Sequence, residues 1–137
     1  MTSKQTKVFV AVILMAVAAI SGCGGGGNAL APQFQPQVAN LPDNFQFQTT
    51  GITNVTQTLQ YTWSNSGLLA SINHASTVTA GTATLTIKDA AGTQVYSGAL
   101  VSSGTVMTSP SGVAGNWTII VTLTNVSGTL NFRVQKA

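Results

Sequence analysis

Few side chains in this sequence could perform acid–base chemistry or hold a metal ion. The 137-residue chain has 2 acidic residues, 5 basic residues and 1 histidine, and glutamate is absent. Catalysis by paired carboxylates needs two acidic groups close together, but Asp43 is expected in a linker and Asp89 in a hairpin turn. A Ser-His-Asp triad is not indicated, because no serine lies in a nucleophile-elbow pattern. The sequence therefore predicts a protein that is not an enzyme.

Two of these residues are better explained by structural roles. His74 alternates with Ala70 and Ile72, which predicts a half-buried histidine in a strand. Zinc sites usually need three or four protein ligands, and this chain does not supply them. Asp89 opens the turn Asp89-Ala90-Ala91-Gly92, where a carboxylate typically accepts hydrogen bonds from its own backbone. We expect neither a metal site nor a cofactor.

Three aromatic residues leave sugar binding open as an alternative. Tyr61, Trp63 and Trp117 lie in phase with aliphatic neighbours, so packing in the core is the first expectation. If one ring lies at the surface, it should be Trp63, beside the Asn65-Ser66-Gly67 loop. An exposed ring would provide a stacking platform for a glycan. Tyr61, Trp63 and Trp117 are thus the candidate ligand-binding residues.

The segments that must position these residues have the pattern of strands. After Asn44, apolar residues recur at every second position, as in Trp117, Ile119 and Val121, with threonine between them. Turns rich in Gly, Asn, Asp and Ser separate the segments. The pattern predicts an all-β, antiparallel β-sandwich of jelly-roll type. About eight strands are expected, at 45–49, 56–64, 68–77, 81–88, 93–97, 99–107, 115–125 and 129–135.

The first 22 residues have the order of a signal peptide. Two lysines precede the apolar stretch 8–20, whose helical length of about 20 Å is too short for a hydrocarbon core of about 30 Å. The following residues, Ile20-Ser21-Gly22-Cys23, resemble the lipobox of bacterial lipoproteins. That resemblance implies cleavage between Gly22 and Cys23 and lipidation of the Cys23 thiol, with membrane lipid as the partner.

The predicted chain therefore has three parts. Residues 1–22 form the lipoprotein signal peptide, 23–44 the lipidated cysteine with a Gly/Pro/Gln-rich linker, and 45–137 the β-sandwich domain. The lipobox resemblance implies a lipid-anchored protein of the cell envelope. If the host is Gram-negative, the outer membrane is implied, because Gly24 differs from the aspartate that retains such proteins at the inner membrane.

A second resemblance concerns the β-sandwich. The segments Leu85-Thr86-Ile87-Lys88-Asp89-Ala90-Ala91-Gly92 and Gly115-Asn116-Trp117-Thr118-Ile119-Ile120-Val121 resemble jelly-roll domains of bacterial pre-peptidase C-terminal type. In that family the domains are accessory modules of secreted enzymes. The resemblance implies a binding or targeting role, although this chain has no attached enzyme and few acidic residues.

Charge narrows the possible partners. Removal of the signal peptide leaves three basic and two acidic residues, so no basic patch for nucleic acid is expected. A strand edge with few lysines is poorly protected against pairing, which favours self-association or contact with an envelope protein. The first functional hypothesis is a membrane-anchored, non-catalytic structural or protein-interaction module. The alternative is a carbohydrate- or peptidoglycan-binding accessory module.

Overall fold

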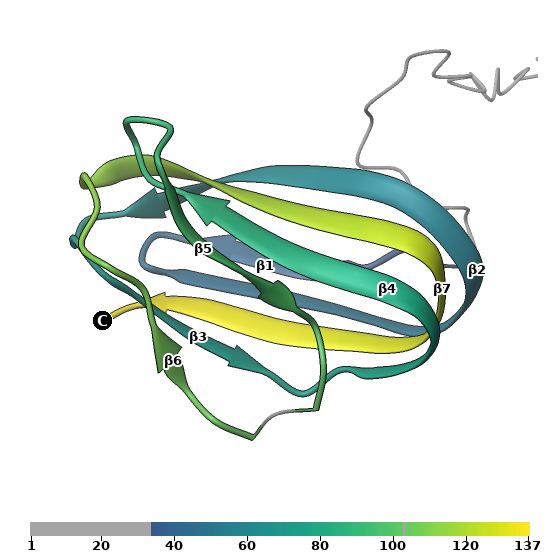
Figure 1. Cartoon of the computed structure of the whole chain (residues 1–137). Coiled ribbons are helices and arrows are strands. Elements are labelled where there is room, and N and C mark those ends of the chain that lie inside the picture. Colours follow the sequence, from purple (N-terminus) through teal and green to yellow (C-terminus); the bar gives the residue numbers. More distant parts are fainter. Residues whose placement is uncertain (1–33, 103) are drawn as a thin grey trace, which may run out of the picture.

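The domain is an antiparallel β-sandwich, as predicted. The computed structural model describes residues 34–102 and 104–137, and the predicted signal peptide and Cys23 lie outside them. The strands are β1 (Gln37–Leu41), β2 (Asn44–Asn65), β3 (Ala70–His74), β4 (Thr77–Lys88), β5 (Gln94–Ala99), β6 (Met107–Thr108) and β7 (Gly115–Lys136) (Figure 1). Within the described part of the chain, no helix has the length and hydropathy needed to span a membrane.

Strands β2 and β7 each run through both layers of the sandwich. Residues 44–49 of β2 pair with 130–135 of β7, and residues 57–65 pair with 115–123. The register shifts three times between Thr49 and Gln57, and such bulges bend a strand pair. The predicted strands 45–49 and 56–64 are therefore two halves of one bent strand. The same holds for 115–125 and 129–135.

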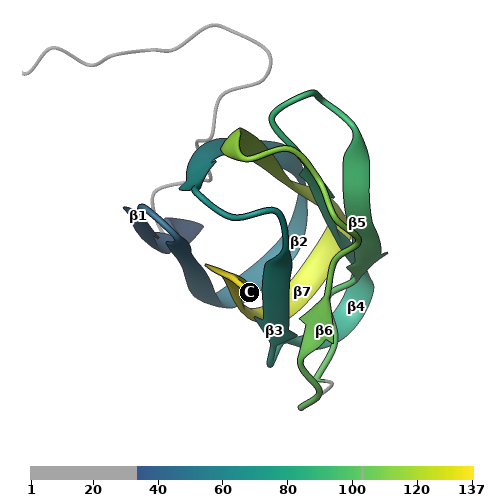
Figure 2. The same ribbon diagram turned by 90° about the vertical axis from the view of Figure 1, so that its left-hand side faces the viewer.

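The remaining strands extend the two layers. In the first sheet β1 pairs with the first half of β2, and β3 and β6 follow the second half of β7. In the second sheet β4 pairs with the first half of β7, and β5 pairs with β4. Seen along the strands in Figure 2, β4 and β5 lie in one layer and β1 and β3 in the other.

Glycine permits the close approach of β4 and β7 at the bend. Gly128 has a φ of 133°, and a Cβ there would overlap the carbonyl oxygen of Thr77. Gly81 has a φ of 73°, and its Cβ would overlap the backbone of Thr124 and Asn125. Side chains are therefore excluded at both positions by conformation and by contact.

The core lies between the two sheets and is rich in aromatic rings. Phe47 and Phe132 of the first sheet stack with ring centroids 5.1 Å apart. Trp63 and Trp117 of the second sheet meet edge to face, with centroids 5.9 Å apart, and both are 0% exposed. The alternation seen in the sequence is the alternation between this core and the outer faces.

The predicted linker is shorter than expected. Part of it forms β1, whose register with β2 runs from Gln37↔Gln48 to Leu41↔Asn44. The domain begins by Phe34, which packs against the core and whose carbonyl oxygen accepts a hydrogen bond of 3.1 Å from Thr49 Oγ1. All five residues of β1 are exposed. An edge strand without a buried face has no alternation for sequence analysis to detect.

The predicted strand 99–107 is wrong, and 68–77 is too long. β5 ends at Ala99, and only Met107–Thr108 forms the short β6. Leu100 is buried and its N–H donates to Ala83 O at 2.8 Å, but Val101 and Val106 are about half exposed. The valines that suggested a strand therefore lie in a surface connection. β3 itself covers only Ala70–His74.

Candidate binding groove

The aromatic residues proposed as a sugar platform lie in or against the core. Trp63 and Trp117 are fully buried, and Trp117 Nε1 donates to Val113 O at 2.7 Å. Tyr61 is partly buried, with its ring centroid 5.3 Å from that of Phe45 and 6.1 Å from that of Phe47. The structure thus contradicts a stacking role for both tryptophans and agrees with the core packing expected first.

His74 has a structural role in β3. It is only 2% exposed, and its Nδ1 lies 2.7 Å from the carbonyl oxygen of Val101. Because a carbonyl only accepts, Nδ1 donates in this contact. The histidine is therefore in a strand, as predicted, but it is fully buried rather than half-buried.

Asp89 organises its turn, as predicted. Its Oδ1 accepts hydrogen bonds from the N–H groups of Ala91 at 3.0 Å and Thr93 at 2.9 Å. Its Oδ2 accepts from Val113 N at 3.0 Å, which ties a second loop to the turn. Across residues 34–102 and 104–137, no group of three His, Cys, Asp or Glu side chains is placed to hold a metal ion.

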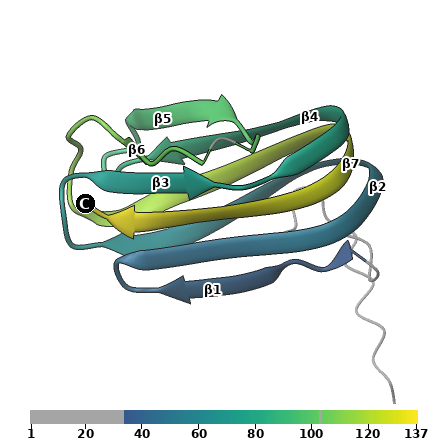
Figure 3. The ribbon, with the colours of Figure 1, turned by 90° about the horizontal axis from the view of Figure 1, so that it is seen from below.

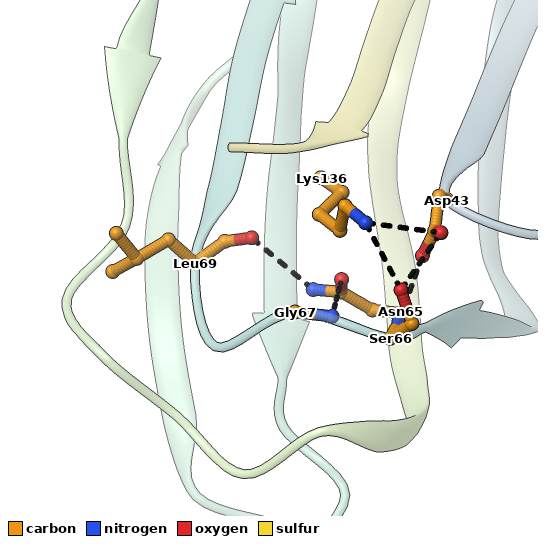
Figure 4. A network of polar contacts seen from close by, with 6 residues as sticks. All are labelled: Asp43, Asn65, Ser66, Gly67, Leu69 and Lys136. Atoms are coloured by element: carbon orange, nitrogen blue, oxygen red, sulfur yellow. Dashed lines mark hydrogen bonds and ion pairs between the residues drawn. The ribbon is translucent and has the colours of Figure 1, made fainter.

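Asp43 lies in the β1–β2 turn and not in a linker. Its Oδ1 accepts from Ser66 N at 2.7 Å, and its Oδ2 accepts from Ser66 Oγ at 2.8 Å (Figure 4). Lys136 Nζ lies 3.5 Å from Asp43 Oδ2. The hydrogen bonds from Ser66, helped by the charge of Lys136, hold the pKa of the Asp43 carboxyl below its usual 3.8. This network joins β1, β2 and β7 at one end of the sandwich.

The Asp43 network predicts a loss of stability in acid. Since folding lowers the pKa of Asp43, its contribution is present above pH 3.8 and is lost as the pH falls through the lower folded value. We expect the melting temperature of Asp43→Asn to fall less steeply below pH 4 than that of the wild type. Thermal unfolding between pH 2 and pH 6 measures this. Identical acid limbs in the two proteins would refute a role for this carboxylate.

The outer face of the first sheet carries most of the described amide side chains that share one surface. Since Phe47, Phe132 and Ile72 point into the core, their neighbours along the strands point outward. The register places the outward residues in rows across β1, β2, β7 and β3, a face seen in Figure 3. One row contains Ala39, Gln46, Arg133 and Asn73, and the next contains Gln37, Gln48 and Asn131.

This face is hollowed by a groove, which we call the amide groove. Its main hollow has a volume of about 280 Å³, near the lower end of roughly 300–1,000 Å³ for small-molecule sites. A second hollow of about 250 Å³ adjoins it at Gln46 and extends over β1. Val106, from the connection before β6, lines the far end. The residues lining the main hollow are Gln46, Ser71, Asn73, Ala75, Val106, Asn131, Arg133 and Gln135.

The chemistry of the amide groove is polar and nearly neutral. Each Asn or Gln side chain offers two donor hydrogens and an acceptor oxygen. Arg133 is the one charged residue of the lining, and its Nη2 donates to Gln46 Oε1 at 3.4 Å. The groove can therefore form many hydrogen bonds with a ligand that both donates and accepts.

Sequence analysis missed this site, although a signal was present. In Asn44-Phe45-Gln46-Phe47-Gln48 every second residue is an amide, and Asn131-Phe132-Arg133-Val134-Gln135 repeats the pattern. Strand pairing brings these two segments side by side. An alternation of amides with core residues, in two segments that pair, would have been the observation to use.

Comparison with known proteins places the chain in no family. No family model matches it. No curated protein matches it either. Among solved structures, it is similar to a carbohydrate binding module from Cellvibrio mixtus lichenase 5A in complex with cellotriose, with a TM-score of 0.45 and 16% identity over 80% of this chain and 92% of that one. It is also similar to CsCBM6-3 from Clostridium stercorarium in complex with cellobiose, with a TM-score of 0.41 and 15% identity over 84% and 99%. This is a similarity of overall shape, and we transfer no residue role from it.

Proposed function

We propose that this domain is a non-catalytic module that binds a glycan in the amide groove. The observation that carries the proposal is the set of amide and hydroxyl side chains on one face of β2, β7 and β3, hollowed to about 280 Å³. Sugar hydroxyls both donate and accept hydrogen bonds, as do Asn and Gln side chains. A neutral polar lining suits such a ligand better than a metal ion, a nucleic acid or an apolar molecule.

The dimensions of the amide groove favour an extended ligand. Its rows cross four strands, and neighbouring strands are about 4.8 Å apart, so a row is about 14 Å long. The second hollow over β1 continues the main one in the same direction. An oligosaccharide lying across the strands would therefore contact both hollows through Gln46.

Binding to soluble polysaccharides tests this proposal. Asn73 and Asn131 line the groove, and each lost hydrogen bond is worth about 0.5–1.5 kcal/mol. We expect Asn73→Ala with Asn131→Ala to weaken binding of a polysaccharide bound by the wild type about tenfold or more, measured by affinity electrophoresis of the detergent-solubilised chain. Thr122→Ala, an exposed position on the second sheet, is the matched control. Absence of any bound glycan, or an unchanged double variant, would refute the proposal.

We also propose that Cys23 anchors the domain in a membrane of the cell envelope. The lipobox-like residues Ile20-Ser21-Gly22-Cys23 support this proposal. Only residues 24–33 separate Cys23 from the first described residue, Phe34, so the tether can extend to at most about 35 Å. A leash of this length would hold the amide groove close to the membrane surface.

Lipid labelling tests the anchor. We expect cells grown with labelled palmitate to incorporate label into the wild-type chain and none into Cys23→Ser, because only the thiol can form the thioether. Two or three acyl chains would hold the domain stably, whereas one would hold it only reversibly. Membrane fractionation should accordingly move Cys23→Ser into the soluble fraction. Equal labelling of both proteins would contradict the anchor.

A second candidate function is pairing with another protein through a sheet edge. Strands β1 and β5 each pair with one described strand only, and neither contains a charged residue or a proline. Such edges are open to further strand pairing. Size-exclusion chromatography of the solubilised chain, over a range of concentrations, would detect self-association, and a constant monomer would count against it.

A further inference from the structure

Arg133 is the charged side chain of the amide groove and lies near its centre. It faces Gln46 on β2 and Asn73 on β3 across the sheet, with Asn131 and Gln135 two residues away on β7. The side chain is exposed and lines the main hollow. A ligand that crosses the strands must therefore pass over its guanidinium group.

The positive charge of Arg133 is not balanced inside the groove. The other lining residues are amides, a serine and two apolar residues. The contact with Gln46 Oε1 at 3.4 Å is long for a hydrogen bond and involves a neutral group. Of the two aspartates, Asp43 is bound to Ser66 and Lys136, and Asp89 is buried among backbone N–H groups. No side-chain carboxylate of the described residues is thus left to compensate Arg133.

We propose that Arg133 makes the amide groove selective for a glycan that carries a carboxylate, such as a uronic acid polymer. This inference rests on the proposed glycan-binding function. The planar guanidinium forms paired hydrogen bonds with a carboxylate, while the surrounding amides bind the hydroxyl groups of the same sugar. A neutral glycan would leave the charge of Arg133 facing only water and amides.

A pair of polymers that differ only in charge tests this selectivity. Polygalacturonate carries one carboxylate on each sugar, and its methyl ester is neutral. We expect the detergent-solubilised wild-type chain to bind polygalacturonate about tenfold more tightly than the ester in isothermal titration calorimetry at low salt. Arg133→Gln should remove this difference by weakening only the acidic polymer. An unchanged melting temperature would show that the exposed substitution leaves the fold intact.

Lys88 provides the control for general charge attraction. It is a cation on the second sheet, at the end of β4, and does not line the amide groove. Lys88→Gln should keep the tenfold preference. Equal losses in Lys88→Gln and Arg133→Gln would overturn the inference, as would equal binding of the two polymers by the wild type, or binding of other, neutral glycans only. The glycan-binding proposal would survive those results, and it would fail only if the wild type bound no polysaccharide at all.

Discussion

Replacement of Gly128 by alanine is expected to destabilise the domain by about 3–5 kcal/mol. Gly128 has a φ of 133°, where L side chains are strained, and an added Cβ would overlap the carbonyl oxygen of Thr77. That oxygen belongs to the backbone of β4, so no side-chain rotation can relieve the contact. The two strands would have to separate at the bend that joins the layers of the sandwich.

Gly51→Ala separates conformational strain from steric overlap. Gly51 also has a positive φ, 63°, but an added Cβ would have no neighbour within 4 Å. We expect it to cost only about 1 kcal/mol. With about 4–8 °C of melting temperature per kcal/mol for a domain of this size, Gly128→Ala should melt at least 10 °C below Gly51→Ala. Circular dichroism on heating measures both, and equal shifts would show that the close approach of β4 and β7 carries no energy.

The sequence predicted the class of fold because burial is written locally in a strand. Trp117, Ile119 and Val121 alternate with outward residues, and one face of a strand must enter the core. The continuity of β2 could not be predicted in the same way. Between Thr49 and Gln57 the bulges interrupt the alternation, so one bent strand has the pattern of two short ones.

The candidate site could not be predicted, since it depends on pairing between distant segments. Gln46 and Arg133 are adjacent only because β2 and β7 pair, and Asn73 joins them through β3. The outward residues of a strand are ordinarily polar, so their identity alone does not indicate a groove. Titratable clusters and exposed aromatic rings, which sequence analysis can detect, are not what forms this site.

Asp89 shows how a local turn residue can support the distant core. Its carboxylate accepts three backbone hydrogen bonds, and the one from Val113 holds the loop before β7. Val113 in turn accepts the hydrogen bond of Trp117 Nε1. Gly112 also packs closely here, since an added Cβ would lie 2.8 Å from Asp89 Cβ. The turn after β4 and the seating of Trp117 are thus one connected unit.

We therefore expect Asp89→Ala to lower stability by about 3–5 kcal/mol, because it leaves three N–H groups without their charged acceptor. Asp89→Asn keeps the shape and one acceptor oxygen, so its loss should be about half as large. Urea unfolding measures both. If the connection to Trp117 is real, acrylamide should quench tryptophan fluorescence more strongly in Asp89→Ala than in the wild type under folding conditions. A destabilised variant with unchanged quenching would show instead that the turn acts alone, and that Trp117 is held by its packing against Trp63.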